Sequence, residues 1–413
     1  MLFSSPIFLF AFLPVTLGLY YLSGKRYRNV ILLVMSVLFY AWGEPDFILI
    51  LGVSVCANHY FGLLAEKYRG TSSGKAVIVL DVLWNTGIFF IFKYLDFTLR
   101  NINAVTGADL TLPGIALPIG LSFFTFQAMS YVFDVYRGKR SQRNILDTAL
   151  YIMFFPQLIA GPIVRYETVA EQINDRRENT DDFIYGIRRF TIGLAKKVIL
   201  SNSCAVVADI GFDGDASALP AWLAWLAALS YSLQIYFDFS GYSDMAIGLG
   251  RLFGFHFNEN FDHPSCAKSV SEFWRRWHIS LGTWFRDYVY FPLGGSRVSS
   301  KLRLVMNLFV VWMLTGIWHG ASWNFVAWGL MYFVLITFEK LTGISKGTKR
   351  IPSVFCRIPT LLFVLLGWVL FRANGLHNAM DFFVSMAGRT SGTVEMFTMH
   401  KIIEHIPYII LSL

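Results

Sequence analysis

The sequence predicts an all-α, polytopic integral membrane protein with about 10–12 transmembrane or re-entrant helices. Of its 413 residues, 55% are hydrophobic and 17% are aromatic, whereas only 15% are charged. Soluble proteins carry about 25% charged residues. The hydrophobic residues also fall in long runs, and the Lys and Arg residues collect in the short segments between them. This pattern is typical of a chain that crosses a bilayer many times.

Apolar stretches follow one another along the whole chain. A helix needs about 20 residues to cross the hydrocarbon core, and several stretches are shorter, so we expect hairpins or re-entrant segments among them. The first has no basic residue before Lys25, and we interpret it as a retained span rather than a signal peptide. The stretches cover residues 6–22, 30–42, 47–65, 76–95, 115–135, 146–163, 183–208, 221–249, 304–318, 322–339, 354–372 and 402–413.

Basic loops predict the orientation. Lys25–Arg28, Lys67–Lys75 and Arg137–Arg143 lie at alternate turns, and a later basic loop contains Lys346, whereas acidic residues near Asp213 mark the opposite side. Because basic loops stay in the cytoplasm, the N-terminus is expected to face away from it. The same rule explains the net charge of +8. The basic residues form no continuous stripe, so we expect no nucleic-acid partner.

We expect one membrane-embedded domain over residues 1–413. The chain stops inside an apolar run at Leu413, and we expect the domain to continue beyond it. The four cysteines have no paired spacing, so they imply neither a disulfide framework nor a zinc site. They are Cys56, Cys204, Cys266 and Cys356.

Two segments are expected to be interrupted within the membrane. Segment 146–163 contains Pro156, Gly161 and Pro162, which break helices, so it should be bent or re-entrant. Basic residues precede stretch 304–318 and follow stretch 322–339, so both outer ends of the pair are expected on the same side of the membrane. The turn at His319 between the two stretches therefore lies inside or across the membrane. An ionisable residue there is a candidate functional group, and desolvation would hold its imidazole neutral, as a general base requires. A structural histidine bonded to a neighbouring carbonyl is the alternative.

A second histidine, His278, lies in a segment rich in arginine and tryptophan. On a helix, Trp274 and His278 would share a face because they are four residues apart, while Arg275 and Arg276 would point elsewhere. Nearby arginines would also disfavour a charged imidazole. The alternative is an amphipathic interfacial helix whose arginines contact lipid phosphates.

Three other sequence patterns are better explained by structural roles than by a ligand site. Asp238, Ser240 and Asp244 near the end of a long apolar span could bind a ligand, but capping and contacts between helices are commoner roles. Segment 256–263 carries ligand-type side chains without the helical histidine spacing of zinc hydrolases, so we expect no metal. The glycines at 248–254 follow an apolar helix, which favours close helix packing over phosphate binding.

Several motifs in order resemble the membrane-bound O-acyltransferase (MBOAT) family over most of the chain, and within it the bacterial branch that acetylates exported polysaccharides such as alginate. They are Phe3-Ser4-Ser5, Phe12-Leu13-Pro14, Leu117–Phe123, Leu158–Pro162, Tyr236–Gly250, Asn258–Phe261, Ser271–Leu281, Trp284–Tyr288, Leu293–Gly295, Gly316–Gly320 and Gly367–Ala373.

The resemblance implies an O-acyltransferase whose essential histidine is His319, with His278 as the second family histidine. We expect His319 to be the general base and His278 a positioning hydrogen-bond donor, so that His278→Asn would retain part of the activity. We also expect Trp318, Trp274, Asp238, Ser240 and Asn324 to contribute to substrate binding.

The same resemblance implies that the donor is acetyl-CoA or another acetyl thioester, which binds from the cytoplasmic side of the bacterial inner membrane. A separately encoded periplasmic or surface acetyltransferase would pass the group to the polysaccharide. D-alanyl transfer to teichoic acid and peptidoglycan O-acetylation are alternatives within the family. A small-molecule transporter is the alternative from another class, and it would predict paired interrupted helices in two related halves.

Overall fold

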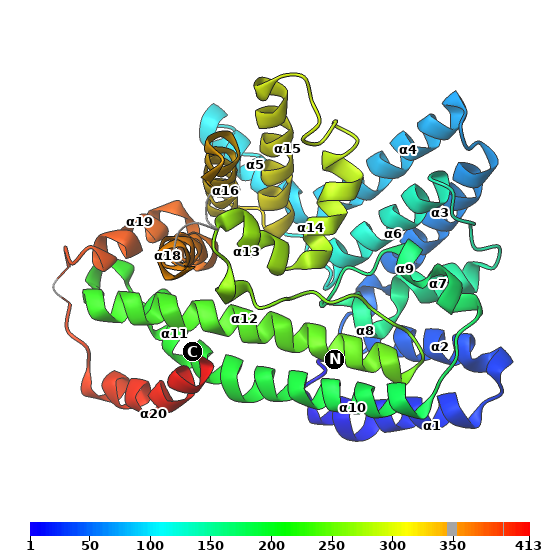
Figure 1. The fold of residues 1–413 in the computed structure, drawn as a ribbon, viewed down its shortest axis with the longest axis horizontal. Helices are drawn as coiled ribbons and strands as arrows, with labels where there is room; N and C mark the ends of the chain where they lie inside the picture. Colours follow the sequence, from blue (N-terminus) through cyan, green and yellow to red (C-terminus); the bar gives the residue numbers. More distant parts are fainter. Residues whose placement is uncertain (345–352, 391) are drawn as a thin grey trace. The chain divides into compact units, whose positions relative to one another are not determined.

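The computed structural model describes residues 1–344, 353–390 and 392–413, and these residues form helices and connecting segments without a strand. The all-α prediction is therefore confirmed. The chain divides into two compact units, each built from two stretches of sequence. Unit 1 comprises Met1–Ile192 with Tyr242–Asn258, and unit 2 comprises Gly193–Gly241 with Glu259–Leu413. Figure 1 shows the helices in the order of the sequence.

Six helical segments in the described part of the chain are long and apolar enough to cross a membrane, and a shorter apolar helix covers Phe8–Leu22. The chain is a multi-pass integral membrane protein. The six segments are Pro45–Lys67, Ser72–Thr106, Thr180–Phe212, Lys301–His319, Trp323–Thr342 and Val354–Arg372.

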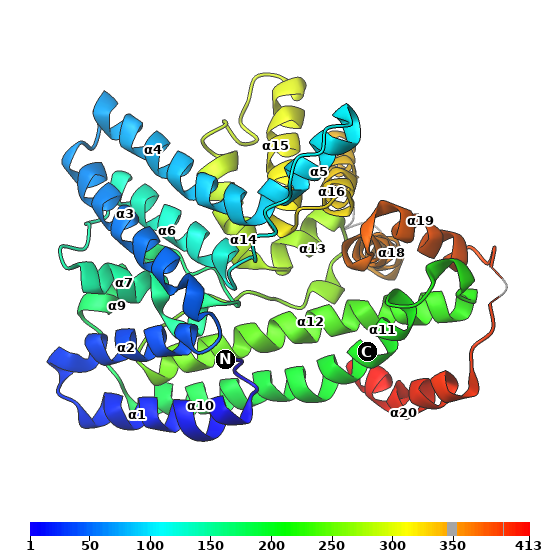
Figure 2. The ribbon, with the colours of Figure 1, turned by 180° about the vertical axis from the view of Figure 1, so that it is seen from behind.

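Unit 1 is built around α3, α4 and α6, which pack against one another, and α7 packs on α2 and α3 (Figure 2). The elements are η1 (Phe8–Phe12), α1 (Leu13–Leu22), η2 (Lys25–Tyr27), α2 (Arg28–Ala41), η3 (Pro45–Phe47), α3 (Ile48–Lys67), α4 (Ser72–Phe89), η4 (Phe90–Tyr94), α5 (Leu95–Thr106), α6 (Leu121–Tyr136), α7 (Ile145–Met153), α8 (Phe155–Leu158) and α9 (Tyr166–Asn174). Parts of α10 (Thr180–Ala195) and α12 (Ala221–Leu252) complete it.

The bend expected in segment 146–163 is confirmed. Helix α7 ends at Met153, Phe154 adopts φ −58° and ψ 114°, and the short helix α8 follows. Pro156 falls in the first turn of α8, where proline is tolerated, whereas it could not have continued α7 as an interior residue. The apolar stretch that was expected to begin at residue 115 becomes helical only at Leu121, because Gly120 with φ +80° lies directly before the helix.

One glycine of the motif at 248–254 does serve close helix packing. A Cβ atom at Gly248 of α12 would lie 2.6 Å from the carbonyl oxygen of Gly186 on α10. Only glycine at both positions lets the two backbones approach so closely. The interpretation of this motif as a packing contact is confirmed for Gly248.

In unit 2, α15 and α16 form an antiparallel hairpin, as the sequence predicted, and α16 packs against α13, α18 and α19. The elements are η5 (Lys196–Ser201), α11 (Asn202–Phe212), η6 (Ala216–Ala218), the first part of α12, η7 (Pro264–Cys266), α13 (Val270–Arg276), α14 (Ile279–Phe285), η8 (Arg286–Tyr290), α15 (Lys301–His319), α16 (Trp323–Thr342), α18 (Ser353–Arg372), α19 (Gly375–Met386) and α20 (Met396–Ser412). Its core is rich in aromatic residues, with Trp277, Trp312, Trp328, Tyr332 and Trp368 buried together.

Basic loops gather at one end of unit 1. The Arg69 guanidinium donates to the carbonyl oxygens of Val135 and Lys139 at 2.5 and 2.6 Å, and Arg143 pairs with Glu66 at 3.0 Å. The loops after α3 and α6 therefore lie together, as loops on one side of a membrane must. The predicted cytoplasmic Lys346 lies outside the described residues.

The predicted orientation can be tested by labelling single cysteines in a background with Cys56 and Cys266 replaced by serine. We expect an impermeant maleimide to label Asp213→Cys in intact cells but Lys139→Cys only after permeabilisation, because basic loops remain in the cytoplasm. Labelling of Lys139→Cys in intact cells would reverse the orientation.

Candidate active site

His319 is the last residue of α15, and the residue that follows it must be small. A Cβ atom at Gly320 would overlap the ring of Phe325, so only glycine lets the chain turn here into α16. The imidazole is half-buried among aromatic rings. The ring centres of Trp318, Trp328 and Phe371 lie 4.9, 5.1 and 5.0 Å away, each edge-on. His319 thus ends an apolar helix in an aromatic setting.

His278 does not share a helix with Trp274, so the expected common face is wrong. Helix α13 ends at Arg276, and His278 is the residue before α14, in the left-handed conformation with φ +45°. A residue with a Cβ atom adopts this conformation only at an energetic cost, and such positions concentrate at functional sites. The break turns the His278 side chain into the interior of unit 2, where it is 3% exposed.

Asn260 stabilises this break. Its backbone carbonyl accepts the N–H of Ile279 at 2.9 Å, and its side-chain Oδ1 accepts the N–H of Ser280 at 3.2 Å. These two bonds satisfy donors at the start of α14 that have no partner within the helix. Asn260 Oδ1 also accepts the Ser280 hydroxyl at 2.8 Å and lies 3.2 Å from Nδ1 of His278.

These contacts define which nitrogen of His278 carries the proton. Oδ1 of Asn260 accepts a backbone N–H, so it is the amide oxygen and has no proton to donate. The Ser280 hydroxyl lies 3.3 Å from Nδ1 but donates to Asn260 Oδ1 at the shorter distance of 2.8 Å, which favours Nδ1 of a neutral His278 as the donor to Asn260 and leaves Nε2 with a lone pair. Nε2 is buried and has no hydrogen-bond partner among the described residues.

The imidazole of His278 is neutral at pH 7. Burial lowers its pKa well below the usual value, and the neighbouring His319 lowers it further. The expected influence of the arginines is not seen, since Arg276 pairs with Glu272 and Asp262, each at 3.0 Å. His278 is thus a buried neutral imidazole with an unused proton acceptor.

Two tryptophans expected at the site lie close to it. Trp318 is buried, and its ring centre is 6.0 Å from that of His278 and 4.9 Å from that of His319. Trp274 is one ring further away, since it contacts Trp328 edge-on at 5.3 Å. The structure therefore brings both histidines to Trp318.

The other predicted binding residues take part in contacts within unit 2. Asp238 pairs with Lys197, and Ser240 is buried with a hydroxyl that has no partner among the described residues. Asn324 donates to the carbonyl oxygens of Leu370 and Ala373 at 3.1 and 3.0 Å, at the end of α18. Their part in substrate binding stays a prediction.

Among the remaining predicted polar residues, those of unit 1 pair internally. Asp244 accepts two bonds from Arg189, at 2.8 and 2.7 Å. His256 lies 3.3 Å from Asp182. Over the described ranges, no group of three or more His, Cys, Asp or Glu side chains could hold a metal ion.

Sequence reasoning missed four residues that shape the site. Asn260 and Ser280 lie in motifs that carried the resemblance. They are 18 and 2 residues away from His278, and neither separation predicts a contact with its side chain. Trp328 and Phe371 are ordinary apolar positions of α16 and α18 until the fold brings them to His319.

Comparison with known proteins places the chain in a family. The model of the membrane-bound O-acyltransferase family matches residues 39–380, and the chain belongs to this family. It is an O-acyltransferase by family, as predicted.

Individual relatives cover most of the chain. The probable alginate O-acetylase AlgI of Pseudomonas syringae pv. tomato is 44% identical over 96% of this chain and 76% of its own length. The peptidoglycan O-acetyltransferase of Helicobacter pylori is 34% identical over 94% of this chain and 80% of its own length. The teichoic acid D-alanyltransferase of Bacillus subtilis is 31% identical over 63% of this chain and 70% of its own length.

Asn260→Ala should destabilise the protein by roughly 1–3 kcal/mol, because the buried donors of Ser280 and His278 lose their acceptor. The apparent melting temperature of the purified protein measures this. Asn258→Ala, at an exposed position two residues away, is the matched control and should leave it unchanged. Equal melting temperatures for the two variants would contradict the capping role.

Proposed function

We propose that the chain transfers an acetyl group from a cytoplasmic thioester for O-acetylation of an exported or cell-surface polysaccharide resembling alginate. The observation that carries the proposal is the pair of histidines beside Trp318 in an aromatic core, within a chain 44% identical to a probable alginate O-acetylase. Alginate O-acetylase names recur among the relatives, at 42% identity in Pseudomonas aeruginosa.

In the proposed reaction His319 is the general base. It takes the proton of a hydroxyl as the hydroxyl oxygen attacks the thioester carbonyl, and a new C–O bond forms. The tetrahedral intermediate then collapses, the C–S bond breaks, and the thiolate leaves. The protonated imidazole returns its proton to the thiolate, so the histidine is regenerated and no further reactant is needed.

We propose a different part for His278 from the one expected from sequence. Because Nδ1 is occupied by Asn260, the available atom is Nε2, which in the neutral ring accepts a hydrogen bond and cannot donate one. We propose that Nε2 accepts a hydrogen bond from a reactant or from the imidazolium of His319. His278 would thus position its partner by accepting a hydrogen bond, and would not polarise a reactant by donating one.

The proposed donor is acetyl-CoA or another acetyl thioester, and the proposed location is the bacterial inner membrane. A polysaccharide is too large and polar to enter the bilayer core. A relay is therefore favoured, in which this chain, acting as one membrane-embedded domain, passes the acetyl group to a separately encoded periplasmic or surface acetyltransferase. That partner would complete the transfer.

Two family alternatives remain weaker proposals. Peptidoglycan acetylation is supported by the 34% identity to the Helicobacter pylori enzyme, and D-alanyl transfer by the 31% identity to the Bacillus subtilis enzyme over a smaller part of the chain. The transporter alternative is set aside, because the chain belongs to an acyltransferase family.

His319→Ala should reduce acetylation by roughly 10²- to 10⁴-fold, the usual contribution of general-base catalysis. The acetyl content of the exported polymer measures this, and immunoblotting of membranes should show a normal amount of protein. Normal acetylation in the mutant would contradict the catalytic assignment of His319.

His278→Gln and His278→Asn separate the roles of the two ring nitrogens. The Gln side chain brings an acceptor oxygen close to the place of Nε2, so it should retain part of the activity if His278 positions a reactant. The Asn side chain reaches only as far as Nδ1 and should lose most of it. An acetyl-transfer assay in isolated membranes compares them with His319→Gln, which should be inactive. An active His319→Gln beside an inactive His278→Gln would exchange the roles.

A further inference from the structure

Unit 1 contains a polar pocket of about 370 Å³ that plays no part in the proposed reaction. It lies where η2 and the start of α2 meet the first residues of α7 and the segment between α9 and α10. Four of its lining residues are cationic, namely Lys25, Arg26, Arg28 and Arg176. Its volume is within the range of small-molecule sites.

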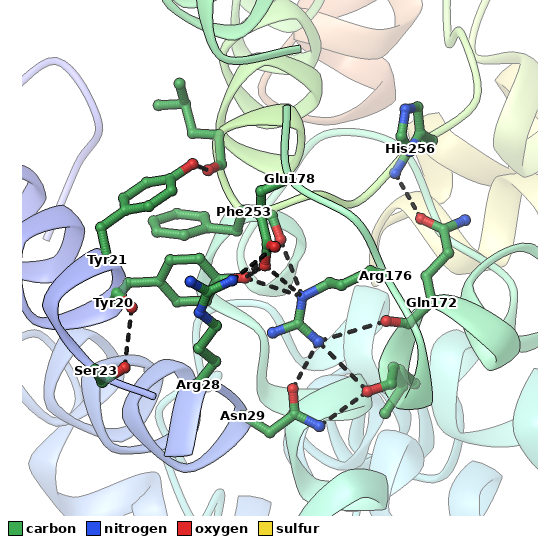
Figure 3. A network of polar contacts seen from close by, with 12 residues as sticks. Tyr20, Tyr21, Ser23, Arg28, Asn29, Gln172, Arg176, Glu178, Phe253 and His256 are labelled. Carbon is green, nitrogen blue, oxygen red and sulfur yellow. Dashed lines mark hydrogen bonds and ion pairs between the residues drawn. The ribbon is translucent and has the colours of Figure 1, made fainter. Parts of the chain in front are cut away.

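One wall of the pocket is a connected network of hydrogen bonds (Figure 3). Glu178 accepts from the Tyr20 hydroxyl and pairs with Arg28 at 2.6 Å. Arg176 donates to Tyr20 at 3.1 Å and to Asn29 Oδ1 at 2.6 Å. Burial alone would raise the pKa of the Glu178 carboxyl, but the bonds from Tyr20 and Arg28 lower it below the ordinary value. The lining carboxylate Asp147 accepts from Asn29 at 3.0 Å, so this wall holds two carboxylates against two guanidinium groups and is matched in charge.

The outer side of the pocket has cationic groups that this network does not use. Lys25 and Arg26 are exposed, and within the described residues neither side chain makes an ion pair or hydrogen bond. The buried Nε of Arg28 has no hydrogen-bond acceptor among the described residues. Asp175 is the exposed carboxylate on this side of the pocket. The positive charges of Lys25 and Arg26 outnumber its single negative charge, so this side favours an anionic ligand.

Apolar side chains line the same pocket, and another ends the helix three residues before Lys25. Leu22, the last residue of α1, is 90% exposed, and the lining residues Val30 and Leu146 are 43% and 44% exposed. In a multi-pass membrane protein, large exposed apolar side chains at the ends of apolar helices face lipid chains. A ligand that fits this setting has an anionic head and an apolar tail.

We propose that this pocket binds the headgroup of an anionic phospholipid, with its phosphate at Lys25 and Arg26 and its acyl chains against Leu22, Val30 and Leu146. Basic residues at the cytoplasmic surface attract anionic lipids by about 1 kcal/mol each. Removing both charges should therefore weaken binding roughly 30-fold. The lipid would hold the loop between α1 and α2 against the segment between α9 and α10.

The test uses the purified full chain in a neutral detergent, titrated with phosphatidylglycerol while the apparent melting temperature is followed. A ligand that binds only the folded state raises this temperature. We expect a saturable rise with phosphatidylglycerol and little with phosphatidylcholine. In the double variant Lys25→Gln/Arg26→Gln, the midpoint of the titration should move to roughly 30-fold higher lipid, with an unchanged melting temperature in the absence of lipid.

The matched control is Lys75→Gln/Lys139→Gln, which removes the same charge from two exposed positions of unit 1 outside the pocket, the first turn of α4 and the loop after α6. It should retain the wild-type midpoint. Equal stabilisation by phosphatidylcholine, or an equal shift in both double variants, would overturn the proposal. Equal stabilisation by water-soluble glycerol phosphate would also overturn it, because the pocket would then bind free phosphates and not lipid.

Discussion

The structure depends on the need of every buried backbone polar group for a hydrogen-bond partner where water is excluded. Helices meet this need internally, so each interruption of a helix must be satisfied by side chains. In unit 2, asparagine side chains do so at two places near the candidate site. Asn260 bonds the first N–H groups of α14, and Asn324 bonds the last carbonyls of α18. Each thereby fixes a segment of the candidate site: His278 precedes α14, and Phe371, which touches His319, lies near the end of α18.

The two histidines are held in different ways, and their chemistry follows from that. His278 is fixed by a left-handed backbone and by the bond from its Nδ1 to Asn260, so its tautomer and ring orientation are both determined. His319 is fixed by the end of α15, by the glycine that follows it and by three aromatic edges. At Nδ1 of His278 the partner is an amide oxygen, and a carboxylate in its place would have favoured a charged imidazole.

The sequence predicted the elements whose cause is local. The hairpin around His319, the bend near Pro156 and the packing role of Gly248 follow from apolar runs, proline and glycine, which act within a few residues. It did not predict the break between Trp274 and His278. No residue there forbids a helix, and the alternative conformation is stabilised by Asn260, which lies 18 residues away. The ion pair between Lys197 and Asp238 was likewise invisible, because it joins different helices.

The aromatic setting of His319 also bears on why the proposed transfer would reach a hydroxyl and not water. A thioester beside a general base hydrolyses when water occupies the place of the acceptor. Trp318, Trp328 and Phe371 present apolar edges to the imidazole, and such surfaces offer water few hydrogen bonds. An acceptor hydroxyl carried on a larger molecule gains contacts with these rings that water lacks. The aromatic rings would therefore contribute to acceptor choice, while the two histidines handle the proton.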